Sequence, residues 1–166
     1  MAKSEAMMHD PNCDICRTNM NASSVPGGVI YENDLWLVRH LMPGRGVPGW
    51  MMAQTRRHVA GIAFFNDAEA LSFGPTFRHL QKVLMEVTGA LRIYTASMNE
   101  SVPHFHCHLV PRYETMPKNA QGWDVFDLFR ASAAGEIEVD AGAVISMTNR
   151  YREALKIDPP VAIVSD

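Results

Sequence analysis

Residues 104–112 read HFHCHLVPR, and the first five of them place a histidine at every second position. In a β-strand the side chains at i, i+2 and i+4 share one face, whereas in a helix this spacing scatters them around the axis. A strand therefore gives a row of imidazoles whose neighbours are about 6.6 Å apart. Phe105, Cys107 and Leu109 then lie on the opposite face. The spacing predicts a strand with one face for chemistry and one for packing.

Four further segments have the composition of strands, namely residues 29–31, 35–41, 50–54 and 92–98. The first two flank the turn signal Glu32-Asn33-Asp34 and predict a hairpin. Together with the histidine-rich strand, these segments predict an antiparallel five-stranded sheet.

Helices are predicted between and after these strands. Asp67 is the expected N-cap of a helix that Gly74-Pro75 either interrupts or restarts. Over residues 77–89 apolar side chains recur at i, i+3, i+4 and i+7, which is the pattern of an amphipathic helix. Residues 125–134 and 148–155 also have helical character. The expected fold class is therefore α+β, with helices packed on an antiparallel five-stranded sheet.

Length and composition are those of one globular domain, with 166 residues, 47% of them hydrophobic and 20% charged. We expect a flexible lead-in over residues 1–12 and a single domain over residues 13–166. Its motif-bearing core covers residues 13–112, and residues 113–166 form a C-terminal extension.

Charge and cysteine content exclude several classes of protein. The net charge of -3 argues against binding to a nucleic acid polymer. No apolar run approaches the roughly 18 residues of a membrane helix. Three cysteines form no disulfide framework, and no secretory leader opens the chain. A cytoplasmic location is the expectation.

The segment Cys13-Asp14-Ile15-Cys16 allows three interpretations. A thioredoxin-like redox pair needs a preceding strand, and the polar residues before Cys13 predict none. Two unrelated buried cysteines are the second interpretation. The third is half of a structural zinc site, since two thiolates in a tight turn bind one metal ion. Tetrahedral zinc needs two more ligands, and the chain has seven histidines to supply them.

The row of three histidines fits a phosphate ligand better than a metal ion. Three side chains in a straight row rarely converge on one ion, so a tri-histidine metal site is disfavoured. A row suits an extended ligand such as a chain of phosphates. Imidazoles donate hydrogen bonds to phosphoryl oxygens, and one of them can act as a nucleophile.

These motifs together resemble a known family. The segment His104-Phe105-His106-Cys107-His108-Leu109-Val110 is similar to the signature His-φ-His-φ-His-φ-φ, where φ is apolar, of the histidine triad (HIT) superfamily of nucleotide hydrolases and transferases. Cys13-x-x-Cys16, Arg56-Arg57-His58 and Asn99 also fit its zinc-containing bacterial members. The resemblance covers roughly residues 13–112.

The resemblance implies a mechanism and roles for four residues. His106 matches the nucleophile that attacks the α-phosphate of a nucleotide and forms a nucleotidyl-histidine intermediate. His108 matches a position that hydrogen-bonds phosphate oxygens, so both histidines are expected to be catalytic. Asn99, Ser101 and His108 are the expected substrate-binding residues, with donors that stabilise phosphoryl charge.

The resemblance also implies a cofactor and an assembly. In zinc-containing members the metal is held by the cysteine pair, the downstream histidine and the first triad histidine. In this sequence these positions are Cys13, Cys16, His58 and His104, and the zinc is structural. Members of the family usually form homodimers whose sheets join across the interface, so we expect a homodimer.

The chain departs from the family pattern at several positions. Many members carry Gly-Gln shortly before the triad, whereas this chain has Asn99-Glu100-Ser101-Val102-Pro103, with Ser101 as a partial substitute. Pro48-Gly49-Trp50 replaces the common Pro-Gly-His, and no acidic residue stands near Arg39-His40 to hold ribose hydroxyls. Trp36 either walls a base pocket or is a core residue. These differences concern nucleoside specificity more than phosphate chemistry.

The sequence therefore predicts a nucleotide phosphohydrolase that cleaves at the α-phosphate of a nucleotide conjugate or dinucleoside polyphosphate. The expected partner is this small nucleotide or dinucleotide, with no nucleic acid polymer and no membrane. Alternatives are a nucleotidyltransferase with the same intermediate and a non-catalytic nucleotide-binding or interaction module. A hydrolase with catalytic zinc on the triad is disfavoured, because the cysteine pair gives a closed, structural site.

Overall fold

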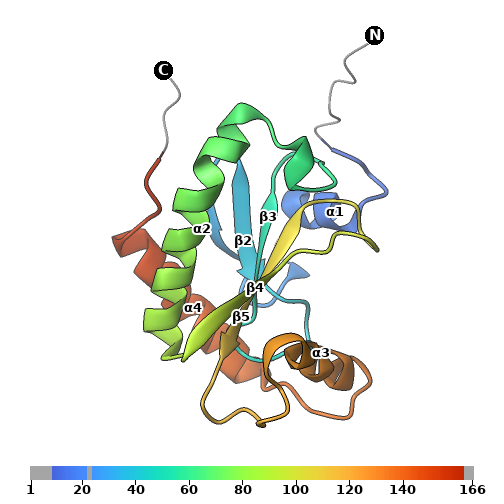
Figure 1. Cartoon of the computed structure of the whole chain (residues 1–166), viewed down its shortest axis with the longest axis vertical. Coiled ribbons are helices and arrows are strands. Elements are labelled where there is room, and N and C mark those ends of the chain that lie inside the picture. The colour runs from blue at the N-terminus through green and yellow to red at the C-terminus, as the bar shows by residue number, and fades with distance from the viewer. Residues whose placement is uncertain (1–8, 22–23, 163–166) are drawn as a thin grey trace.

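The computed structural model describes residues 9–21 and 24–162, so most of the lead-in predicted over residues 1–12 lies outside the described residues. Figure 1 shows the arrangement of the chain. In chain order the elements are α1 (Asp14–Met20), β1 (Val29–Glu32), β2 (Trp36–His40), β3 (Met51–Thr55), the 3-10 helix η2 (Ile62–Phe64), α2 (Asp67–Thr88), β4 (Arg92–Ala96), β5 (His106–Arg112), the 3-10 helix η3 (Gly122–Asp124), α3 (Val125–Ala133) and α4 (Ala141–Ile157).

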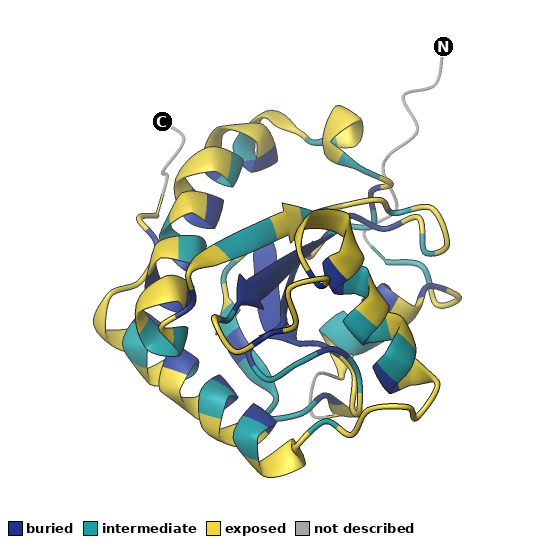
Figure 2. Ribbon diagram, turned by 60° about the horizontal axis from the view of Figure 1, so that its bottom comes forward, coloured by how far each residue is buried: buried dark blue, intermediate teal, exposed yellow. Residues whose placement is uncertain are grey.

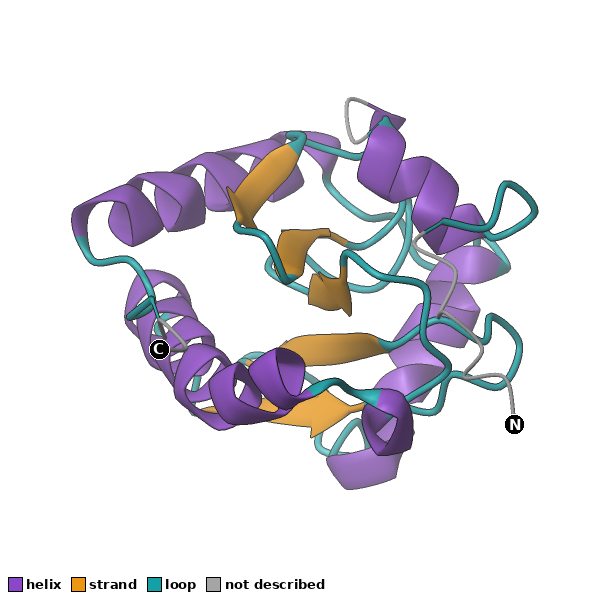
Figure 3. Cartoon of the chain, turned by 90° about the horizontal axis from the view of Figure 1, so that it is seen from above, coloured by secondary structure: helices purple, strands orange, loops and turns teal. Residues whose placement is uncertain are grey.

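The five strands form one sheet in the order β1-β2-β3-β5-β4, and every neighbouring pair is antiparallel. This confirms the predicted α+β class and the five-stranded antiparallel sheet. All residues of β2 and β3 are buried, while the helices expose their outward faces (Figure 2). Helices surround the sheet in the view from above (Figure 3).

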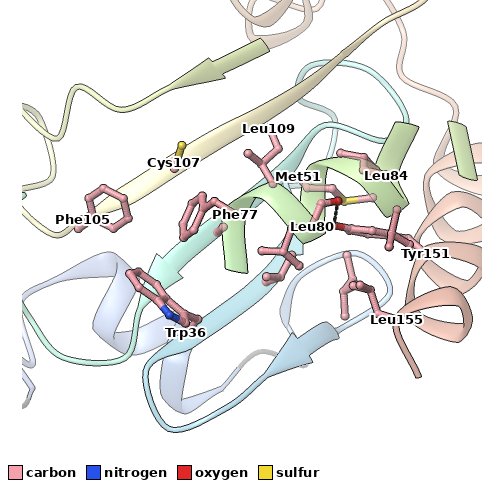
Figure 4. Packing of buried hydrophobic residues seen from close by; sticks show 14 of the residues in the cluster. Trp36, Met51, Phe77, Leu80, Leu84, Phe105, Cys107, Leu109, Tyr151 and Leu155 are labelled. Atoms are coloured by element: carbon pink, nitrogen blue, oxygen red, sulfur yellow. Dashed lines mark hydrogen bonds between the residues drawn. The ribbon is translucent and has the colours of Figure 1, made fainter. Parts of the chain in front are cut away.

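One face of the sheet packs against α2 and α4 and forms the main hydrophobic core (Figure 4). Tyr151 of α4 is fully buried, and its hydroxyl donates to the carbonyl of Leu80 in α2 at 2.8 Å. Trp36 lies in the same core, with its indole nitrogen 2.9 Å from the hydroxyl of Ser72. Trp36 is therefore a core residue, and the base-pocket interpretation is wrong. Full burial of each large apolar side chain contributes about 1.5–3 kcal/mol.

Helix α2 runs unbroken through Gly74-Pro75, so the predicted interruption is wrong. The helix begins with a capping box in which Asn66 is the N-cap and Glu69 returns a hydrogen bond to its backbone, one residue before the predicted N-cap. Proline removes the donor for the carbonyl of Leu71, four residues earlier. Leu71 is exposed, so water is able to satisfy that carbonyl.

The C-terminal extension covers both faces of the sheet. Helix α3 matches the prediction and packs Val125 against Trp50 and Val110 on the face opposite α2. Helix α4 starts seven residues before the predicted 148–155, because Asp140 caps it by accepting from the backbone N–H of Ala143 at 3.0 Å. None of the helices in the described residues combines the length and apolarity that crossing a membrane requires.

A turn before β1 contacts α4 and joins that helix to the sheet. Gly27 has φ 73°, and a Cβ added there would lie 2.4 Å from the Cγ2 atom of Thr148 in α4. Arg152 of α4 donates to the carbonyls of Gly27 and Val29. The neighbouring Gly28 has nearly the same φ, 72°, but open space around it.

We predict different losses of stability for Gly27→Ala and Gly28→Ala. Both variants incur the left-handed backbone penalty of about 1–2 kcal/mol, and only Gly27→Ala adds overpacking of about 1–3 kcal/mol. Urea unfolding of the two variants at 25 °C measures the difference, with Gly28→Ala as the matched control. Equal free energies of unfolding would show that α4 does not rest on this turn.

Candidate functional site

A pocket of about 1570 Å³ lies on the face of the sheet opposite α2 and α4. Its wall takes side chains from β2, β3 and β5, from α1 and α3, and from residues 98–102. The strand register explains which residues meet there. Arg39, Met52 and His108 form one cross-strand row. Gln54 and His106 form the next row on the same face, because side chains two residues apart in a strand point the same way.

His106 is held so that one ring nitrogen is free for chemistry. Its Nδ1 atom lies 2.7 Å from the carbonyl oxygen of His104, and a carbonyl only accepts, so Nδ1 carries the proton. Nε2 then keeps its lone pair in a wall of the pocket. Burial is the main cause that lowers the pKa of His106, which favours this neutral form.

His108 has the opposite tautomer. The indole nitrogen of Trp50 donates to its Nδ1 atom at 3.0 Å, so the ring proton of neutral His108 is on Nε2. Burial, followed by the charges of neighbouring groups, lowers the pKa of His108 to about 4. Phe126 of α3 contacts both rings edge-on, with centroids 5.3 Å from Trp50 and 5.4 Å from His108. The row thus presents an acceptor at His106 and a donor at His108.

Trp50 is the residue that the sequence reasoning missed. It stands at the histidine position of the common Pro-Gly-His, and the sequence analysis treated it only as a departure. Its side chain could have indicated the role, because tryptophan, like histidine, has a ring N–H group that donates a hydrogen bond.

The first triad histidine belongs to a different cluster. His104 lies just before β5, which begins at His106, so the prediction that all three histidines share the strand is wrong. Its Nδ1 atom lies 3.5 Å from the sulfur of Cys13 and 3.4 Å from that of Cys16. His58 completes the cluster, with Nδ1 3.4 Å from the sulfur of Cys16. The four ligand atoms all lie within 4.8 Å of one another.

This cluster has the chemistry of a metal site. In tetrahedral coordination by sulfur and nitrogen, ligand atoms are about 3.6 Å apart, which the contacts in the cluster match. The Nε2 atom of His104 lies 2.8 Å from the carbonyl oxygen of Thr55, so Nε2 carries the proton and the Nδ1 lone pair faces the thiols. Unrelated buried cysteines would not need this orientation. We therefore assign Cys13, Cys16, His58 and His104 as a candidate metal site.

Helix α1, which the sequence did not predict, contains Cys16 and has Cys13 as its N-cap. The helix is short, and its buried residues are Ile15 and Cys16, which pack with Cys13 and Val102. No strand precedes α1 in the described residues, which agrees with the argument against a thioredoxin-like pair.

Comparisons with known proteins identify the fold. Neither a protein-family model nor a curated protein matches the sequence. Among solved structures, a Hit-like protein of Bartonella henselae, described as involved in cell-cycle regulation, is 17% identical with a TM-score of 0.63, covering 89% of this chain and 98% of that one. A Zn-bound histidine triad family protein of Mycobacterium smegmatis is 15% identical with a TM-score of 0.63, covering 88% and 94%.

A histidine triad protein of Bradyrhizobium japonicum is 17% identical with a TM-score of 0.59, covering 76% and 88%. The chain has the histidine triad fold. The resemblance seen in the sequence is thus confirmed at the level of structure.

Within the histidine triad fold, Asn99 supports the triad through the backbone. Its Oδ1 atom accepts from the backbone N–H of His106 at 3.0 Å, and its Nδ2 atom donates to the hydroxyl of Ser97 at 2.8 Å. The residue has φ 54°, a left-handed conformation that asparagine tolerates. Ser101 lines the same pocket. Both predicted substrate-binding residues therefore reach the site, and Asn99 also fixes the start of β5.

Cys107 has no part in either cluster. It is buried on the α2 face of the sheet, and burial raises the pKa of its thiol to about 12. The thiol therefore stays protonated at neutral pH and serves packing, as the alternation in the strand predicts.

We predict that Trp50→Phe changes the tautomer of His108. Phenylalanine keeps an aromatic ring against Phe126 but removes the donor to Nδ1, so His108 loses the group that selects its Nε2–H form. Imidazole ¹⁵N NMR would then report a mixture of tautomers and a raised pKa for His108, while the signals of His79 on α2, outside the pocket, serve as the internal control. An unchanged His108 spectrum would rule out this role for Trp50.

Proposed function

We propose that the protein is a nucleotide phosphohydrolase in which His106 attacks the α-phosphate of a nucleotide conjugate or dinucleoside polyphosphate. The free Nε2 lone pair of His106, held by the Nδ1–H hydrogen bond to the carbonyl of His104, carries this proposal. The fold shared with histidine triad proteins supports it.

The proposed reaction has two displacement steps at phosphorus. In the first, Nε2 of His106 forms a bond to the α-phosphorus, and the bond from phosphorus to the leaving group breaks with its electron pair on the leaving group. The Nδ1–H bond to His104 then stabilises the cationic ring. In the second step water forms a bond to phosphorus and loses a proton to the solvent, while the P–N bond breaks with its electron pair on Nε2 of His106, and the nucleoside monophosphate leaves. The Nε2–H group of His108 donates to a phosphoryl oxygen in both steps.

The alternatives share the pocket and differ in outcome. A nucleotidyltransferase uses the same intermediate with a phosphate or sugar-phosphate acceptor in place of water. A non-catalytic nucleotide-binding or interaction module uses the pocket without either step. The roles of Asn99 and Ser101 as substrate ligands and the homodimer belong to the proposal too, as does the cytoplasmic location.

We infer that the metal of the cysteine–histidine cluster is zinc in a structural role. The ligand set of two thiols and two imidazole Nδ1 atoms fits structural zinc. Zinc bound there would supply a rigid cross-link between α1, the segment after β3 and the start of the triad. The Zn-bound histidine triad protein of M. smegmatis supports the choice of metal.

We predict that His106→Asn abolishes turnover. Wild type releases a nucleoside monophosphate from a panel of adenylyl and guanylyl phosphoanhydrides and phosphoramidates. The variant loses about 10³-fold or more in kcat, because asparagine has no nucleophilic nitrogen. His79→Asn, on α2 outside the pocket, is the matched control and keeps activity. Reactions in H₂¹⁸O place one ¹⁸O in the product if water is the acceptor. A wild type inactive on the whole panel favours the binding module, and equal turnover by His106→Asn refutes the nucleophile.

We predict about one zinc per chain, with Cys13→Ser lowering the zinc content and the melting temperature together, because the site would lose a thiolate ligand. Elemental analysis of the purified protein measures the metal. Cys107→Ala removes a thiol outside the cluster and is the control that retains zinc. A folded wild-type protein without zinc would refute the site.

A further inference from the structure

Arg39 is a buried cation without a counter-ion. Its exposed fraction is 4%, yet none of the acidic residues within 9–21 and 24–162 forms an ion pair with it. Its Nε atom donates to the side-chain oxygen of Gln54 at 3.2 Å and its Nη1 atom to the carbonyl of His40 at 3.0 Å. Its Nη2 atom has no hydrogen-bond partner in this part of the chain. Burying a charge without an anion is unfavourable, so the guanidinium has unused binding capacity.

Arg39 lines the same pocket as His106 and His108. Met52 of β3 pairs with Arg39 of β2 on one side and with His108 of β5 on the other. Only β3 therefore lies between the strands that carry Arg39 and His108. The Nε atom of Arg39 is bonded to Gln54 of β3, and Gln54 is the register partner of His106. Burial does most to lower the pKa of His108, and the charges of His106 and Arg39 lower it further.

A chain of hydrogen bonds that starts in α1 positions the guanidinium of Arg39. The side-chain amide nitrogen of Gln54 donates to the Oδ1 atom of Asn19 at 2.7 Å, which leaves the Gln54 oxygen to accept from Arg39. Asn19 in turn donates to the carbonyl of Thr55 at 2.9 Å. Asn19 thus orients the amide of Gln54, and Gln54 orients the guanidinium of Arg39. Arg39 is therefore held in place before any ligand binds.

The pocket wall is locally cationic although the chain carries a net charge of -3. Four arginines line the pocket, and Arg17 and Arg130 are paired with neighbouring carboxylates. Arg45, like Arg39, has no acidic partner in the described part of the chain. The reacting phosphoryl group already has the donor of His108. Two further cations in the same pocket exceed what one phosphoryl group needs.

We infer that Arg39 forms an anion subsite that holds a second phosphoryl group of the substrate beside the one that His106 attacks. A guanidinium offers two parallel N–H donors that match phosphate oxygens, and a phosphate would supply the missing counter-ion. The substrate class is then a nucleoside phosphoanhydride, with a charged phosphoryl leaving group, in preference to a phosphoramidate with an uncharged one. The substrate class rests on the proposed hydrolase, whereas anion binding by Arg39 does not.

Calorimetric titration with inorganic pyrophosphate tests the subsite without turnover. Wild type binds pyrophosphate, and Arg39→Met weakens binding at least 10-fold. Arg78→Met, exposed on α2 at the opposite face of the sheet, is the control and binds as wild type does. Arg39→Met also keeps the wild-type melting temperature or raises it, since it removes an uncompensated buried charge. Pyrophosphate raises the melting temperature of the wild type only.

The result that would overturn the inference is undiminished pyrophosphate affinity in Arg39→Met. If this variant does not fold, Arg39→Lys carries the test, because lysine keeps the charge but loses the bidentate fork. It is expected to bind pyrophosphate several-fold more weakly, and equal affinity would overturn the subsite.

Turnover measurements on two substrates distinguish a failure of the anion subsite from a failure of the proposed hydrolase. Arg39→Met lowers kcat/KM at least 10-fold more for a dinucleoside polyphosphate than for a nucleoside phosphoramidate. Equal losses on both substrates would refute the preference for phosphoanhydrides. If wild type turns over neither substrate but binds pyrophosphate through Arg39, the proposed hydrolase fails and the anion subsite stands.

Discussion

The ring and the carbonyl of His104 connect the cysteine–histidine cluster to the triad. Its Nε2–H group is fixed by the carbonyl of Thr55 at the end of β3, which turns Nδ1 toward the two thiols. Its own carbonyl accepts from the Nδ1–H group of His106 and so sets the tautomer of that ring. A shift of His104 would therefore change the cluster and the free nitrogen of His106 together. The bend that takes His104 out of β5 makes both contacts possible, because a strand residue would spend its carbonyl on the sheet ladder.

The pocket controls protonation through hydrogen bonds and burial. Trp50 and the carbonyl of His104 select opposite tautomers for His108 and His106, while burial keeps both rings neutral. The positive charge of Arg39 also disfavours the protonated, cationic form of both histidines. The site thus concentrates its permanent charge on arginine and leaves the histidines as a neutral acceptor and a neutral donor. This division suits phosphoryl chemistry, in which donors stabilise anionic oxygens and the nucleophile needs a lone pair.

Sequence patterns predicted the parts of the structure that follow local rules. Short apolar runs and the turn signal at Glu32-Asn33-Asp34 located the other strands, and the strict i, i+2 spacing placed His106 and His108 on one face and Cys107 on the other. The proximity of Cys13 to His58 came from the family resemblance, because no local pattern joins residues so far apart. Helix α1 was missed, since it is short and is stabilised by contacts that the local sequence does not reveal.

Other features depend on which strands become neighbours. Arg39 reads as one polar residue in an apolar strand, and only the register of β2, β3 and β5 brings it near the triad. The same is true of Trp50, whose partner His108 is far along the chain. The break predicted at Pro75 was wrong because an exposed carbonyl tolerates the loss of one helical donor.

The two faces of β5 have different roles, because one face packs in the hydrophobic core and the other lines the pocket. Cys107 and Leu109 pack into the α2 and α4 core, whereas His106 and His108 line the pocket. Substitutions at alternate positions of one strand are thus subject to different selective pressures. A substitution on the pocket face changes the contacts to a ligand while the core stays packed. A substitution on the core face lowers the stability of the scaffold although it touches no ligand.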